Sequence, residues 1–252
     1  MNLTRSKKKD LLYVAVAAFF FLTACVLQTV DDYISDWSVK TTIALLTQYI
    51  FFGLLAYWTA SVIGRVSNKN VRSGITVAIV LMGMILLIRL LKYHVFYEET
   101  ATRYLWYSYY IPQCIAPVVL LLTILGMGRQ EGRPLAKGWY LLFLPAAALI
   151  LLVFTNDLHE QVFSFAKGLK YSNEIYKWEW GYYFILSWIA VLYLSIGVLL
   201  YIKCRVSGCR KKAWIPLVLF IVCIVLCVLR EVFDPVFIRM PEAVVFSVVV
   251  VF

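Results

Sequence analysis

The sequence predicts an all-α protein, a polytopic bundle of transmembrane helices that crosses the bilayer about seven to eight times. Hydrophobic residues make up 63% of the 252 positions, only 15% are charged, and the apolar residues gather in runs long enough to span a bilayer. Soluble domains average about 45–50% apolar and about 25% charged residues. Lipid is therefore the expected solvent for most side chains.

The apolar runs place the expected helices in order along the chain. They lie near residues 11–30, 42–63, 75–93, 104–125, 139–154, 181–201 and 214–232, with a final run at 243–252. The final run covers about half a bilayer, so an incomplete helix is expected there. Residues 1–10 are a basic segment, and the run after them serves as a signal anchor because no small-residue cleavage site closes it. Pro112 and Pro117 are expected to kink the fourth helix, and Pro145 the fifth.

Loop charges predict the direction of each helix. Loops rich in Lys and Arg alternate without a break with loops that are acidic or mixed. The basic loops carry Arg5, Lys7, Lys8 and Lys9, then Arg65, Lys69 and Arg72, then Arg129, Arg133 and Lys137, then Lys203, Arg205, Arg210, Lys211 and Lys212. The positive-inside rule then predicts a cytoplasmic N-terminus in a multi-pass protein of the plasma membrane.

The net charge of +10 lies in these loops and not along one basic face, which favours the lipid bilayer over nucleic acid as a partner. Six cysteines lie mostly inside apolar runs, where they behave as small hydrophobes, so no disulfide framework and no cysteine zinc site are expected.

Three common catalytic motifs are missing from the sequence: the phosphate-binding loop GxxxxGK[ST], the zinc-binding HExxH and the hydrolase motif GxSxG. With no loop long enough for a catalytic domain, we expect no enzymatic activity, no catalytic residue, no cofactor and no resident metal.

The sharpest local feature is a polar string, Thr155 to His159, at the end of the run 139–154. Thr155, Asn156 and Asp157 can bond backbone groups nearby and end or restart a helix. His159 is a candidate pH switch or metal ligand, and His94 is expected on the same, outer side. An outer ligand or metal site and a purely structural role remain the alternatives for this cluster.

Charged residues near the outer helix ends are further candidates. Arg89 lies in the outer third of its helix, and Glu231 ends the helix near 214–232. Charges at such depths are usually paired or functional, and Asp157 and Glu231 are the candidate partners for Arg89. Tyr and Trp residues cluster around the same outer loops, where they indicate either interface anchoring or an aromatic-lined pocket.

The segment 152–159, Leu-Val-Phe-Thr-Asn-Asp-Leu-His, resembles a hallmark of the seven-transmembrane sensor region at the N-terminus of bacterial histidine kinases. Gly181 and the aromatic residues after it resemble the start of the next helix in that family. The resemblance covers roughly the second half of the chain. One extra helix at the N-terminus reconciles the cytoplasmic N-terminus here with the outer one of the family, and Glu160 stands where the family often has a second histidine.

The resemblance implies a membrane-embedded sensory module of a two-component signal transduction system, which relays a signal from the outer face or the bilayer to a cytoplasmic output. Candidate signal or ligand residues are Asn156, Asp157, His159, His94, Arg89 and Glu231. The implied partner is a cytoplasmic histidine kinase, on this chain or on another, because kinase segments do not occur before Phe252; a homodimer is compatible with this interpretation. The alternatives are a transporter or channel subunit, disfavoured by sparse intramembrane charge, and a scaffold that partners a separate kinase.

Overall fold

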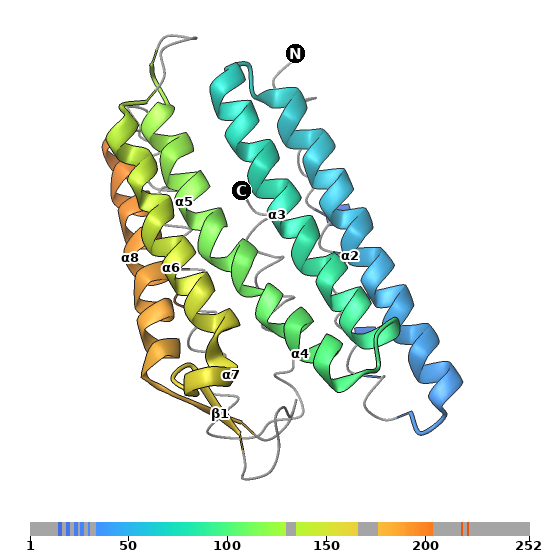
Figure 1. Ribbon diagram of the computed structural model, residues 1–252. Helices are drawn as coiled ribbons and strands as arrows, with labels where there is room; N and C mark the ends of the chain where they lie inside the picture. The colour runs from blue at the N-terminus through green and yellow to red at the C-terminus, as the bar shows by residue number, and fades with distance from the viewer. Residues whose placement is uncertain are drawn as a thin grey trace, which may run out of the picture. The chain divides into compact units, whose positions relative to one another are not determined.

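The computed structural model describes residues 34–129, 135–165 and 176–203, with isolated residues between 15 and 30 and at 218 and 221. The helices are α2 (Trp37–Arg65), α3 (Lys69–His94), α4 (Glu99–Ser108), α5 (Tyr110–Gly126), the 3-10 helix η1 (Lys137–Leu142), α6 (Phe143–Phe154), α7 (Asn156–His159) and α8 (Trp180–Lys203) (Figure 1). The strands β1 (Phe163–Phe165) and β2 (Tyr176–Trp178) form an antiparallel ribbon. The helical class is confirmed, and the ribbon is an addition that the sequence did not predict.

Five described helical segments are long and apolar enough to cross a membrane, as expected of a multi-pass membrane protein. They are Trp37–Gly64, Lys69–His94, Glu99–Gly126, Lys137–Phe154 and Trp180–Lys203. The helices expected near 214–232 and 243–252, and most of the one near 11–30, lie outside the described residues. Five candidate crossings are therefore described, and the predicted total of seven to eight stays a prediction.

Two prolines lie in the first turn after a junction between helices within the spans. Pro112 has no N–H to donate to the carbonyl of Ser108, and α4 ends at that residue before α5 begins. Pro145 likewise cannot bond the carbonyl of Leu141, and the 3-10 helix η1 gives way to α6 at Phe143, two residues before it. Pro117 lies inside α5 without ending it. The predicted kinks at Pro112 and Pro145 therefore coincide with junctions between helices.

The chain divides into two compact units. The first comprises residues 1–62 and 218–252, and the second residues 63–217. In the second unit, α5 packs against α3 on one side and against α6 and α8 on the other, while α4 contacts α3 and α6 (Figure 1). The core of this unit is built around the fully buried side chains of Cys114, Val118, Val153 and Phe163.

Successive spans of the second unit run in opposite directions (Figure 1). The ends of α3 and α6, the starts of α4 and α8, and the β1–β2 ribbon therefore share one end, here named the ribbon end. The described residues at the opposite end include no acidic side chain. The basic residues there are Lys69, Arg72, Arg129, Lys137 and Lys203. The described charged residues at that end are thus all basic, whereas the ribbon end carries both acidic and basic side chains, among them Asp157 and Arg103.

Candidate functional site

The polar string folds into a single helical turn, α7, directly after α6. The Thr155 hydroxyl donates to the carbonyl of Leu151 at 2.8 Å, so it satisfies a backbone acceptor at the end of α6. Glu160 follows α7 in the left-handed backbone region with φ 48°, and its N–H donates to the carbonyl of Asn156 at 2.7 Å. The turn therefore reverses the chain at the ribbon end and projects its three polar side chains in different directions.

Asn156 is directed into the protein and is fully buried. Its Oδ1 accepts from the N–H groups of Val162 and Phe163 at 2.9 and 3.0 Å, and its Nδ2 donates to the carbonyl of Phe163 at 2.9 Å. These partners are the first residue of β1 and the residue directly before it. Asn156 thus joins α7 to the ribbon, and its polar atoms are used within the fold.

The imidazole of His159 closes the turn locally. Its Nδ1 accepts from the N–H of Gln161 at 3.0 Å, which assigns the ring proton to Nε2. Nε2 lies 3.2 Å from the Thr155 hydroxyl, so both ring nitrogens have partners. Among the described residues, no group of three or more His, Cys, Asp or Glu side chains could hold a metal ion.

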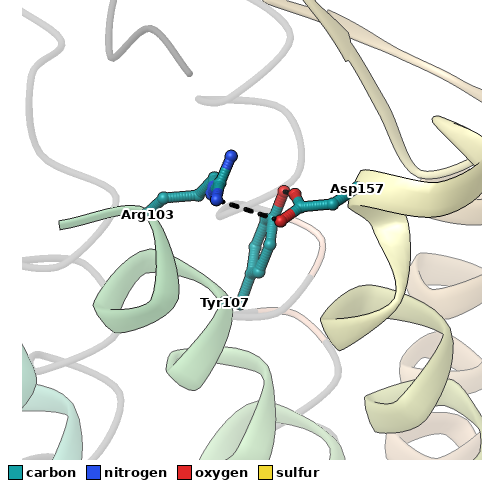
Figure 2. A network of polar contacts seen from close by, with 3 residues as sticks. All are labelled: Arg103, Tyr107 and Asp157. Carbon is teal, nitrogen blue, oxygen red and sulfur yellow. Dashed lines mark hydrogen bonds and ion pairs between the residues drawn. The ribbon is translucent and has the colours of Figure 1, made fainter. Parts of the chain in front are cut away.

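Asp157 makes the long-range contacts of the string. Its Oδ1 accepts a 2.7 Å hydrogen bond from the hydroxyl of Tyr107, 50 positions earlier in the sequence. Its Oδ2 lies 3.2 Å from Nη2 of Arg103. Arg103 and Tyr107 are one helical turn apart on α4, so both face the α7 turn (Figure 2). The network connects α4 to the segment that follows α6.

The network is less exposed to water than a surface ion pair, so solvent and salt screen its charges less. The side chain of Arg103 is 11% exposed, that of Asp157 is 24% exposed, and Tyr107 is fully buried. Arg103 uses one nitrogen for Asp157, whereas its buried Nε has no hydrogen-bond partner within the described part of the chain. A guanidinium can bind a carboxylate through two nitrogens, so this pair holds less than its full hydrogen-bonding capacity.

An aromatic layer lies beside the network. The Trp106 ring packs on Phe163 of β1, with ring centroids 4.4 Å apart, and on Tyr176 of β2 at 5.1 Å. Trp178 stacks on Tyr182 at the start of α8 with centroids 4.7 Å apart. The ribbon therefore ties α4 to α8 across the ribbon end through aromatic contacts.

The other predicted site residues lie elsewhere. His94 ends α3, where its carbonyl accepts from the Tyr97 hydroxyl at 3.2 Å. The guanidinium of Arg89 lies over the Tyr93 ring, 5.9 Å from its centroid, and the arginine that pairs with Asp157 is Arg103. The predicted candidate Glu231 is outside the described residues.

Arg103 and Tyr107 were missed from the sequence because Arg103 reads as a loop charge and Tyr107 as part of an interfacial aromatic belt. The signal that could have found them is their spacing of four residues on one helix, which places a cation and a phenol on the same face. Comparisons of the chain with protein-family models, curated proteins and solved structures give no match.

Proposed function

We propose that this chain is a membrane-embedded sensory input module of a two-component system, and that the Arg103–Asp157–Tyr107 network is its switching element. The observation that carries the proposal is this network itself, a half-satisfied and partly buried ion pair between two elements at the ribbon end. The resemblance of the segment 152–159 to the histidine kinase sensor region supports the same function.

Two arrangements of the ion pair are chemically reasonable. In the observed one, Tyr107 and Arg103 take one carboxylate oxygen each, and the buried N–H at Nε of Arg103 stays unbonded, at a cost of about 1–3 kcal/mol. In the other, both carboxylate oxygens of Asp157 accept from Arg103, so Oδ1 is shared between Arg103 and the Tyr107 hydroxyl. A signal that favours one arrangement shifts the population toward it.

The helices offer a path from this network to the opposite end. The α4–α5 span runs from Arg103 to the end of α5, where the Lys203 ammonium at the end of α8 donates to the carbonyls of Ile124, Leu125 and Met127 at 2.7–2.8 Å. In the proposed orientation this basic end is cytoplasmic. A change at the ribbon end then reaches the chain beyond α8 and a cytoplasmic histidine kinase, on this chain or another.

The test is hydrogen–deuterium exchange on the full chain in lipid nanodiscs. Asp157→Asn keeps the size of the side chain and weakens its pairing with Arg103, so exchange should change both near residues 155–163 and near residues 124–129 and 200–203. Glu160→Gln is the matched control, because it removes an exposed carboxylate close by. Changes confined to the ribbon end would refute the relay. If the protein carries a solute across proteoliposome membranes and Asp157→Asn changes that flux, a transporter function would be favoured instead.

A further inference from the structure

The last two turns of α3 carry two cations on one side of the helix. Arg89 and Lys92 are three residues apart, so their side chains lie on the same face, and they repel each other electrostatically. Lys92 is only 5% exposed. Its ammonium lies over two rings, 5.0 Å from the centroid of Tyr93 and 5.8 Å from that of Trp106. An aromatic frame therefore holds Lys92 in place beside Arg89.

A third donor, Tyr109, belongs to the junction between α4 and α5. Tyr109 and Tyr93 lie within electrostatic range of the Arg89 guanidinium. The Tyr109 hydroxyl is buried and has no hydrogen-bond partner in the described part of the chain. Buried hydroxyls in native proteins are normally bonded, so an unbonded one within electrostatic range of Arg89 indicates an acceptor that binds from outside the chain.

A guanidinium, an ammonium and a phenol together offer many hydrogen-bond donors and two positive charges, which is the chemistry that binds phosphate groups. We propose that Arg89, Lys92 and Tyr109 form a binding site for a phosphate-type anion at the ribbon end. Tyr93, which contacts both cations, is half exposed, and Tyr97 and Tyr104 nearby in the sequence are also exposed. Such aromatic residues sit at head-group depth, where lipid phosphodiesters are abundant.

This site is separate from the Asp157 network. The Trp106 ring lies between the two sites: the Lys92 ammonium is over this ring, and Phe163 of the ribbon packs against it. The anion site therefore occupies the contact between α3 and α4, whereas the ion pair of Asp157 joins α4 to α7. It stands whether or not the chain is a sensor.

The test measures binding of two phosphate probes to the full chain in detergent. Phosphatidylglycerol binding is followed by native mass spectrometry, with diacylglycerol as the matched lipid without phosphate, and inorganic phosphate is added as a competitor. We expect phosphatidylglycerol to bind and diacylglycerol not to bind. Displacement by inorganic phosphate identifies a site open to a soluble anion, and retention of the lipid identifies a head-group site; both outcomes support the proposal.

Three variants test the assigned residues. Arg89→Gln and Lys92→Gln should each weaken phosphate binding about tenfold or more, and Tyr109→Phe about fivefold. Lys92→Arg keeps the charge and should retain binding, and Lys177→Gln removes an exposed lysine of β2 as the control. Because Tyr109→Phe removes only a hydroxyl, it remains informative if the charge variants do not fold. The proposal is overturned if neither probe binds, or if Tyr109→Phe and the foldable charge variants bind like the control.

Discussion

Asn156 and Phe163 are joined by two reciprocal hydrogen bonds. The N–H of Phe163 donates to Oδ1 of Asn156 at 3.0 Å, and Nδ2 of Asn156 donates to the carbonyl of Phe163 at 2.9 Å. Both residues are fully buried. The side-chain amide thus replaces a backbone partner that the first residue of β1 would otherwise lack.

Replacing Asn156 with Ala should destabilise the protein by at least about 3 kcal/mol. The change leaves the N–H groups of Val162 and Phe163 and one carbonyl buried without partners, and each unbonded group costs about 1–3 kcal/mol. Thermal unfolding in detergent, followed by circular dichroism, measures the loss. Asn70→Ala removes an exposed amide of α3 and should leave the midpoint unchanged. Equal midpoints for the two variants would show that the amide does not support the ribbon.

The positions of the described spans could be predicted well, because an apolar run of bilayer length is typical of a membrane-spanning helix. The run predicted at 75–93 corresponds to α3, Lys69–His94. The difference is residues 69–74, nearly two turns, which are mostly polar but helical because the Asn68 side chain accepts from the N–H groups of Asn70 and Val71. Hydropathy does not register such a cap.

The roles within the candidate site could not be predicted from the string 155–159. Its residues were identified by type, but which of them faces the protein depends on the α7 turn and on the packing of α4 against α6. Asn156 and His159 are used locally, while Asp157 pairs with Arg103 and Tyr107. The three-residue strands of the ribbon are too short to give a sequence pattern of their own.

Gly181 should not tolerate a side chain. A Cβ there would lie 2.8 Å from the carbonyl oxygen of Gln161, the same atom that accepts from the N–H of Gly181 at 2.9 Å. Gly181→Ala must therefore move the backbone between α7 and β1, and we expect a loss of about 1–3 kcal/mol. Gly53→Ala is the control, since open space surrounds that position in α2 and alanine favours a helix by about 0.5–1 kcal/mol. A midpoint for Gly181→Ala at or above the wild-type value would contradict the close contact.

Glu160 offers a stabilising change. It holds a left-handed backbone conformation, φ 48°, that costs a non-glycine residue about 1–2 kcal/mol, and asparagine adopts this conformation more readily. Glu160→Asn should raise stability by about 0.5–1 kcal/mol, as judged by the shift of the thermal midpoint. Glu160→Gln removes the same charge without easing the backbone, so it separates the conformational effect from the electrostatic one. If both variants shift equally, charge and not conformation is responsible.

Lys203 fastens the end of α8 to the end of α5. Its ammonium donates to the carbonyls of Ile124, Leu125 and Met127 at the end of α5, where the last carbonyls lack the amide partners of a helix interior. The carbonyl of Ile124 also accepts from the N–H of Met127 at 3.0 Å. Lys203→Met keeps the length of the side chain and removes every donor, so we expect a loss of about 1–2 kcal/mol and faster amide exchange over residues 124–129. Lys177→Met, on the exposed side of β2, provides the comparison. If exchange over 124–129 is the same in both variants, the three hydrogen bonds do not hold α5 and α8 together.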